Sequence, residues 1–179
     1  MSDLPPNQCD IGIIDLKTLI LDHINRSPGI RYRELLRLSG LTNGALEYHI
    51  KILEKTQKIK VDRLHGRRPR YFPLDMEAEE ARIMGHIRNI SSRQIVLFIL
   101  EHDLCTFGEI LEHMKKAPST ISWHLKRLVE TEVISIIHGQ ELQLYKISNI
   151  QLVSNVLSKY KDSLSDKVAD EYYEMFGQL

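Results

Sequence analysis

The segment DRLHGRRPR, residues 62–70, gathers side chains that are suited to holding an anion. Its basic residues are Arg63, His65, Arg67, Arg68 and Arg70. A guanidinium group can donate two parallel hydrogen bonds to one phosphate, so this segment is typical of a phosphate contact. The alternative is a solvated hairpin whose arginines only keep it soluble. We favour the phosphate contact, because many arginines on a narrow loop repel one another unless an anion is near.

The basic side chains belong to a longer patch in the first half of the chain. Residues 26–70 contain 12 Lys and Arg against 4 Asp and Glu, whereas the whole chain has 24 of each kind. Residues 1–90 carry 15 basic and 12 acidic side chains, and residues 91–179 carry 9 and 12. This local excess predicts attraction to a polyanion and assigns that attraction to the first half.

Composition limits the kinds of fold and partner. The chain has 179 residues, 42% of them hydrophobic and 27% charged, as in an ordinary folded protein. Cys9 and Cys105 lie far apart and have no Cys or His at metal-binding spacing, which argues against a zinc site and a disulfide framework. The apolar run IVLFIL is too short to cross a bilayer. We expect a soluble, cytoplasmic protein with no membrane partner and no metal or other cofactor.

The chain repeats itself at an ungapped offset of 75 residues, which places residues 30–61 over residues 105–136. The identical pairs are Glu34/Glu109, Leu36/Leu111, His49/His124, Lys51/Lys126, Leu53/Leu128, Thr56/Thr131 and Ile59/Ile134. Conservative pairs such as Tyr48/Trp123 fall on the same helical phase. We therefore interpret the chain as two copies of one structural unit.

Each copy predicts a helix, a helix-turn-helix and a two-stranded hairpin. The first helices are expected at 13–25 and 92–102, and the second helices end near Gly40 and Lys115. Thr106 and Glu109 form a capping box, while Thr42 and Pro118 mark the starts of the third helices. Hairpin turns follow at residues 65–66 and 138–139.

This order of elements predicts a mostly α fold with small β-hairpins, in the α+β class. We expect tandem winged helix-turn-helix domains and a C-terminal helix. The predicted segments are a first domain at 11–75, a connecting helix at 76–91, a second domain at 92–148 and a C-terminal helix at 149–179. The connecting segment is rich in helix-forming residues, so the two domains are expected to be held rigidly.

The segment STISWHLKRLVETEVIS, residues 119–135, resembles the recognition-helix region of winged-helix repressors of the ArsR and MarR type. The doubled arrangement resembles archaeal transcription regulators with two such domains. The resemblance implies sequence-specific binding of double-stranded DNA by a repressor-like homodimer, with the third helices in the major groove. Metal sensing occurs in the ArsR family, but this chain lacks a closely spaced cysteine pair, so we do not extend it here.

Helical phase separates the buried stripe of each third helix from the face that could read DNA. The candidate DNA contacts of the first copy are Thr42, Asn43, Gly44, Glu47, Tyr48, Lys51 and Lys55, together with the basic residues of 62–70. Those of the second copy are Ser119, Thr120, Ser122 and Lys126. We expect Trp123 to contact protein, and His49 and His124 to be packing residues. A small-molecule effector is left open.

The C-terminal helix is predicted to run from residue 150 to residue 176 with an apolar stripe. The stripe contains Val153, Leu157, Tyr160 and Leu164, with Tyr172 continuing it irregularly. We expect this stripe to form the dimer interface, since winged-helix repressors usually dimerise through terminal helices. The alternative is that the helix packs back on its own chain.

No catalytic pattern accompanies these features. The sequence lacks a Gly-rich phosphate loop, a nucleophile elbow and a dinucleotide-binding fingerprint, so no enzyme activity is expected. The alternative function is a protein-interaction module of a transcription or chromosome-organising complex. In that case the acidic second half and the surfaces at Tyr48 and Trp123 would be the docking sites.

Overall fold

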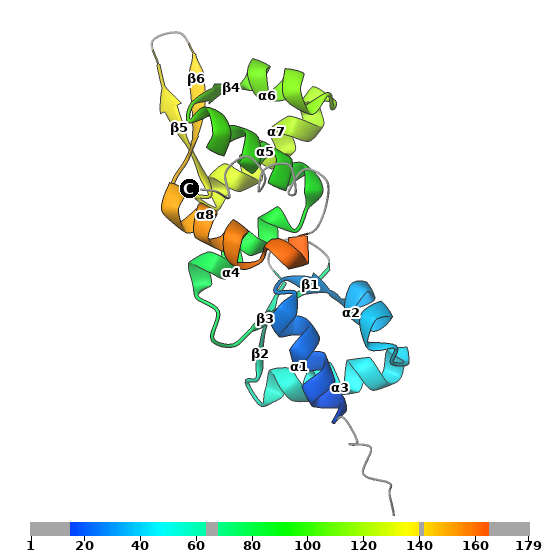
Figure 1. Ribbon diagram of the computed structural model, residues 1–179. Helices are drawn as coiled ribbons and strands as arrows, with labels where there is room; N and C mark the ends of the chain where they lie inside the picture. The colour runs from blue at the N-terminus through cyan, green and yellow to red at the C-terminus, as the bar shows by residue number, and fades with distance from the viewer. Residues whose placement is uncertain (1–14, 64–67, 140–141, 165–179) are drawn as a thin grey trace, which may run out of the picture.

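Two small helical domains lie end to end in the computed structural model, with α4 and α8 between them (Figure 1). The structure describes residues 15–63, 68–139 and 142–164. The elements of the first domain are α1 (Leu16–Arg26), β1 (Ile30–Arg31), α2 (Tyr32–Ser39), α3 (Asn43–Lys55), β2 (Ile59–Asp62) and β3 (Arg70–Pro73). Helix α4 (Ala78–Ile87) follows and leads into the second domain.

The second domain repeats the same order of elements. They are α5 (Ile90–His102), β4 (Cys105–Thr106), α6 (Phe107–Met114), α7 (Pro118–Glu130), β5 (Ile134–His138) and β6 (Gln143–Ile147). Helix α8 (Ile150–Lys159) and a 3-10 turn (Lys161–Leu164) follow. The predicted tandem winged helix-turn-helix fold, mostly α with small antiparallel sheets, is confirmed.

The offset of 75 residues holds in the backbone itself. Helices α6 and α7 begin and end 75 positions after α2 and α3. A left-handed residue ends both α2 and α6, at Gly40 (φ 66°) and Lys115 (φ 49°). A second left-handed pair, Gln57 and Glu132, follows α3 and α7. The internal repeat read from the sequence is therefore a structural repeat.

Both sheets have three antiparallel strands, one more than the sequence predicted. Their orders are β1-β3-β2 and β4-β6-β5. The additional strand pairs Ile30 with Tyr71 in one domain and Cys105 with Tyr145 in the other. A strand of two residues is too short to show alternation in the sequence, so the pattern could not reveal it.

The predicted helix starts are largely confirmed by their caps. Oγ1 of Thr42 accepts from the backbone N–H of Ala45 (3.4 Å), and Thr106 and Glu109 form the expected capping box. Helix α5 begins earlier than expected, because Oδ1 of Asn89 accepts from the backbone N–H of Ser92 and caps it. The connecting helix accordingly ends at Ile87.

The two hydrophobic cores do not follow the boundary between the repeats. The first core lies between α1, α2, α3 and the sheet, around Ile24, Leu35 and Leu46. The second core contains α4, α5, α7 and α8, and it also includes Phe72 of β3. Phe72 is 2% exposed, so a strand of the first domain contributes a large side chain to the core of the second.

For the residues that the structure describes, the C-terminal stripe follows the alternative, in which the helix packs back on its own chain. Val153, Leu157 and Leu164 are buried in their own chain, and Tyr160 packs against the same core. Helix α8 lies against α4, and Nζ of Lys159 binds the Glu80 carboxylate (3.0 Å). These side chains therefore already have an apolar partner in the same chain.

The helix predicted from residue 150 to residue 176 is shorter in the structure. Helix α8 stops at Lys159 and is followed by the 3-10 turn. Tyr172 lies outside the described residues.

Candidate nucleic-acid interface

Helix α3 presents one polar face to the outside and buries the opposite face. Leu46, Ile50 and Leu53 are buried, as helical phase predicts. The predicted contacts Thr42, Asn43, Gly44, Glu47, Tyr48, Lys51 and Lys55 are all exposed. Tyr48 stands out because 63% of its surface is exposed although it is a large aromatic residue. The face is therefore accessible along the whole length of the helix.

Two side-chain interactions organise this face. The Tyr32 hydroxyl lies 2.8 Å from both the backbone carbonyl oxygen and Oδ1 of Asn43, to which it can donate. Lys51 and Glu47 form an ion pair (2.7 Å) one turn apart. Hydrogen bonding to Lys51 lowers the pKa of Glu47, which stays ionised. Lys51 is thus partly neutralised, and Lys55 is the cation of this face nearest the helix end.

The first wing is attached to α3 by a bidentate ion pair. Nη1 and Nη2 of Arg63 donate to the two carboxylate oxygens of Glu54 at 2.6 and 2.8 Å. This hydrogen bonding lowers the pKa of Glu54. Arg68 is exposed, whereas His65 and Arg67 lie outside the described residues. Arg63 therefore positions the wing against the helix, and Arg68 is the described wing arginine that faces solvent.

Arg70 was predicted to contact phosphate, but the structure buries it. It is 7% exposed, and its Nη1 donates to the backbone carbonyl oxygen of Gly29 (2.7 Å). Burial lowers its pKa to about 10, with further contributions from Arg31 and Arg88. Arg70 stands at the start of β3, the central strand, where β1 covers it. Its guanidinium ties β3 to the turn before β1 and is not on the outer surface of the wing.

Helix α7 repeats the arrangement of α3 in the second domain. Ile121, Leu125 and Leu128 are buried. The predicted contacts Ser119, Thr120, Ser122 and Lys126 are exposed. Near the tip of the second wing the described residues are His138, Gly139, Leu142 and Gln143, so this part of the wing carries no Lys or Arg; Gln140 and Glu141 lie outside the described residues.

Trp123 lies where the two domains meet. The guanidinium carbon of Arg127 is 4.8 Å from the centre of its ring, and 53% of the indole is exposed. Trp123 and Arg127 line a small hollow together with Arg31 and Arg70 of the first domain. The hollow beside the tryptophan is thus lined by residues of both domains.

The two paired histidines occupy equivalent positions with different partners. His124 is buried, and its Nδ1 lies 2.9 Å from Oγ of Ser92. Burial lowers its pKa, with Lys116 and Arg127 adding to the effect. Nδ1 of His49 is buried with no hydrogen-bond partner among the described residues, because the first repeat has Lys17 where the second has Ser92. Neither ring faces the outer side of its helix, which is consistent with a packing role.

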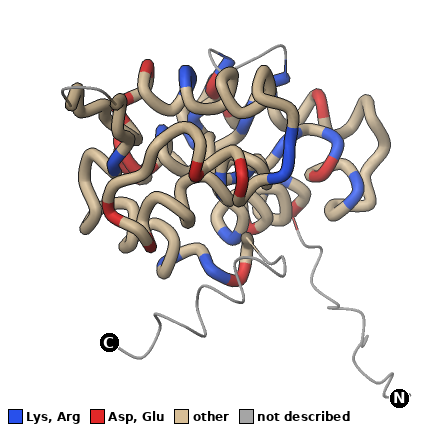
Figure 2. The backbone as a smooth tube through the Cα atoms, turned by 90° about the horizontal axis from the view of Figure 1, so that it is seen from above, with Lys and Arg blue, Asp and Glu red and all other residues tan. Residues whose placement is uncertain are grey.

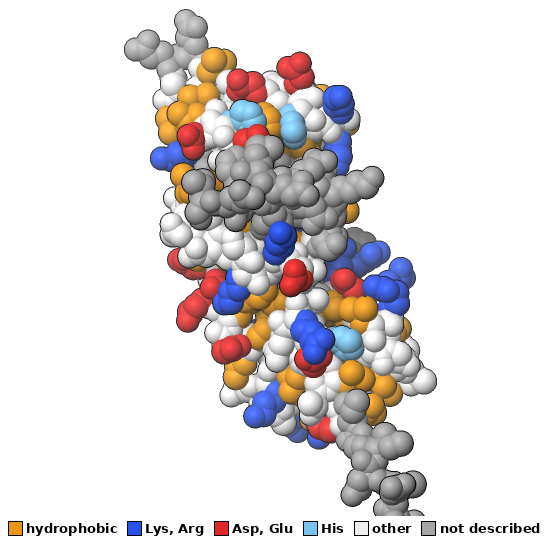
Figure 3. Space-filling model, in the orientation of Figure 1, with side chains coloured by type: hydrophobic (Ala, Val, Ile, Leu, Met, Phe, Trp, Pro, Cys, Tyr) orange, Lys and Arg blue, Asp and Glu red, His pale blue; other side chains and the backbone are white. Residues whose placement is uncertain are grey.

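Charge is interleaved along the backbone rather than divided between two faces (Figure 2). Lys and Arg side chains gather at one edge of the molecule, level with β1 and the start of α2 (Figure 3). A shallow pocket at this place is lined by Arg31, Arg33 and Arg68. Part of the basic patch, with Arg31, Arg33 and Arg68, therefore lies near the junction of the domains.

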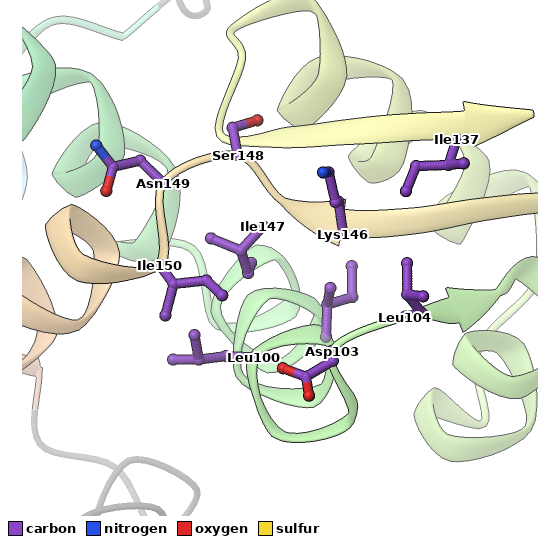
Figure 4. A pocket seen from close by; sticks show the side chains of 10 residues that line it. Leu100, Asp103, Leu104, Ile137, Lys146, Ile147, Ser148, Asn149 and Ile150 are labelled. Atoms are coloured by element: carbon purple, nitrogen blue, oxygen red, sulfur yellow. The ribbon is translucent and has the colours of Figure 1, made fainter.

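An apolar hollow lies on the second domain between the end of α5, the β5-β6 sheet and the start of α8 (Figure 4). Its volume is about 590 Å³. Leu104, Ile137 and Ile150 line it and are themselves exposed, with Lys146 and Asp103 at its edge. It offers an apolar surface to which neither α3 nor α7 contributes a side chain.

In the described ranges, His, Cys, Asp and Glu side chains form no group of three or more that could hold a metal ion. The same ranges contain no helix with the length and apolar character needed to cross a membrane.

These features define the protein as a tandem winged helix-turn-helix protein in which both third helices expose a polar face. Residues 14–84 match a family model described as an N-terminal helix-turn-helix domain. Residues 91–135 match the model of the bacterial regulatory protein, arsR family. These matches confirm the predicted tandem of helix-turn-helix domains, and the second domain is similar to the arsR family.

A curated relative adds a similarity that extends across both domains. The chain is 26% identical over 127 residues to an uncharacterized HTH-type transcriptional regulator of Methanocaldococcus jannaschii. The alignment covers 71% of this chain but 31% of the relative. The chain thus spans less than a third of that protein's length.

Proposed function

We propose that this protein is a transcription regulator that binds double-stranded DNA. The observation that carries the proposal is the pair of equivalent helices α3 and α7, each exposing a continuous polar face next to a wing. A helix of this kind fits the major groove, where Lys, Ser, Asn and Glu side chains can meet base edges. The matching family models and the relative named as a transcriptional regulator support the same function.

The first domain is proposed to supply most of the contact with phosphates. Residues 26–70 hold the excess of positive charge, and Arg68 is exposed on the wing. The ion pair between Arg63 and Glu54 joins this wing to α3, so a phosphate contact at the wing and base contacts at the helix would form together. The second domain adds a weaker contact, because its described wing residues include no Lys or Arg near the tip.

Binding to a duplex at several salt concentrations tests this function. Arg68→Ala removes one phosphate contact, so the slope of log K against log salt should become shallower by about 0.9, the value for one released counterion. Lys146→Ala removes one exposed charge beside the apolar hollow and should leave the slope unchanged. Equal slopes for Arg68→Ala and the wild type would remove the wing from the DNA contact. Absence of salt-dependent duplex binding in the wild type would contradict the function.

The same titration distinguishes DNA binding from the alternative function, that of a protein-interaction module. Tyr48 and Trp123 are exposed aromatic residues at equivalent positions, which is the feature that favours it. A module of this kind would bind its partner with little dependence on duplex DNA or salt. Repression rather than activation is part of the proposal, and a reporter gene downstream of a selected duplex tests it.

A homodimer remains part of the proposal, but the surface differs from the expected one. The exposed apolar side chains around the hollow, Leu104, Ile137 and Ile150, support pairing through the second domain. Light scattering at micromolar concentration checks the mass, and Ile137→Glu should then yield monomers. A monomeric wild type would remove the dimer without affecting DNA binding by one chain.

A further inference from the structure

A tyrosine at the start of α2 holds the side chain at the start of α3. The Tyr32 hydroxyl lies 2.8 Å from Oδ1 of Asn43 and 2.8 Å from the backbone carbonyl oxygen of the same residue. A hydroxyl has one proton, which these two oxygens share. The Tyr32 ring packs against the core of the first domain, whereas Asn43 is exposed. An exposed side chain of α3 is therefore held from inside the domain.

The surroundings of Tyr32 keep its hydroxyl a donor. Desolvation raises the pKa of Tyr32, and the nearby Glu47 carboxylate adds to this effect. The hydroxyl therefore keeps its proton at neutral pH and donates to the carbonyl end of the Asn43 amide. The amino end of that amide, Nδ2, is the part of the side chain that is left for a partner outside the chain.

The second repeat lacks both side-chain partners of this hydrogen bond. The residues 75 positions later are Phe107 and Pro118. Phe107 packs against its own core as Tyr32 does, but it has no hydroxyl. Pro118 is the first residue of α7 and has no side-chain amide. The same pair of helices thus forms without this hydrogen bond, so the fold does not require it.

We propose that Tyr32 is a positioning residue for DNA recognition, which holds the Asn43 amide so that Nδ2 donates to an acceptor on a base edge in the major groove. This inference rests on the proposed function. Asn43 is the first residue of α3, and the first turn of a recognition helix is the part that contacts base edges. Tyr32 itself packs behind this residue and acts through it.

The restraint on the amide predicts which base it favours. An unrestrained Asn can bind adenine with both ends of its amide, by donating to N7 and accepting from the N6 amino group. The carbonyl end of Asn43 is engaged by Tyr32, so a base edge that offers only acceptors fits the side chain better. Guanine presents two acceptors, N7 and O6, in the major groove. We therefore expect guanine to be preferred over adenine at the base pair that Asn43 contacts.

The test measures base preference at one position, which a change in fold stability alone would not alter. A duplex is first selected from a random pool with the full chain, and all its single-base variants are then titrated. Tyr32→Phe removes the hydroxyl and keeps the ring. It should reduce the preference for guanine over adenine by about tenfold, the value of one hydrogen bond.

Asn43→Ala identifies the base pair and shows whether Tyr32 acts through the amide. This variant should abolish the preference at one position, and Tyr32→Phe in the same background should change nothing further. Phe107→Tyr is the matched control, since it places a hydroxyl at the equivalent position of the second domain, where residue 118 has no amide. It should leave the base preferences unchanged. Urea unfolding checks that each variant is folded.

A guanine preference that Tyr32→Phe reduces only when the Asn43 amide is present supports the positioning role. Three results would overturn it while leaving DNA binding intact: Asn43→Ala changes no base preference, the wild type prefers adenine at that position, or Tyr32→Phe has the same effect with and without the amide. An unchanged preference in Tyr32→Phe would overturn it as well. A wild type that binds no duplex would remove the proposed function and this inference together.

Discussion

Arginines of the first wing that look alike in the sequence take three different roles in the structure. Arg63 pairs with Glu54, Arg68 faces solvent and Arg70 is buried against the carbonyl oxygen of Gly29. The wing and its basic character followed from composition and turn residues. The burial of Arg70 did not, because it depends on the two-residue strand β1, which leaves no periodic signal.

Arg70→Ala should destabilise the fold, whereas Arg68→Ala should not. Removing the Arg70 guanidinium leaves the Gly29 carbonyl oxygen without its donor, which costs about 1–3 kcal/mol. An exposed side chain such as Arg68 contributes within about 0.5 kcal/mol. Urea unfolding measures both free energies. Equal values for the two variants would show that the Arg70 hydrogen bond does not contribute to stability.

The ion pair between Arg63 and Glu54 should make a pH-dependent contribution. The folded pKa of Glu54 is lowered, so its stabilisation is present above the unfolded pKa and is lost as pH falls through the folded pKa. The pair is partly exposed and should stabilise by about 0.2–1 kcal/mol at pH 7. We expect Arg63→Ala to be less stable than the wild type at pH 7 and similar to it at pH 3. A difference of unfolding free energy that persists at pH 3 would contradict this assignment.

At the scale of elements, the sequence predicted where helices begin better than it predicted the surfaces against which they pack. Thr42, Pro118 and the Thr106 capping box are local signals, and each marks the start of a helix in the structure. The apolar stripe of α8 was also recognised, but its partner was assigned to a second copy. An apolar stripe predicts that one face of a helix is buried, but it does not identify the apolar surface against which that face packs.

Leu157→Ala tests the partner of α8. Because Leu157 is buried in the chain's own core, the change should lower the free energy of unfolding by about 2–5 kcal/mol. Ile150→Ala, at an exposed position at the start of the same helix, should have a much smaller effect. The solution mass of Leu157→Ala should equal that of the wild type by light scattering. A fall in mass without loss of stability would restore α8 as a dimer interface.

The whole molecule is joined more tightly than a pair of repeats connected by a linker. Nε of Arg88 donates to the carbonyl oxygen of Pro28 (2.8 Å), and its Nη1 donates to that of Ser163. Phe72 of β3 lies in the core of the second domain. The sequence predicted rigid coupling from the helix-forming connecting segment, but it could not show that a strand of the first repeat takes part.

Phe72→Ala should therefore weaken the second domain as well as the first. Burial of this side chain predicts a loss of about 3–5 kcal/mol in the free energy of unfolding. Trp123 belongs to the second domain, so its emission during urea unfolding should show a lower midpoint for Phe72→Ala. The exposed neighbour Leu74, changed to Ala, should leave that midpoint in place. An unchanged Trp123 midpoint in Phe72→Ala would show that the domains unfold independently.

Because Phe72 lies in the core of the second domain, the boundaries of the sequence repeat differ from those of a unit that can fold alone. The second repeat was expected to begin at residue 92, so a cut at that position would separate the two repeats. Such a cut would remove Phe72, Met76 and helix α4 from the core that they complete, and leave an open apolar surface on α5 and α8. A fragment intended to fold as the second domain must begin before Phe72, within the hairpin of the first.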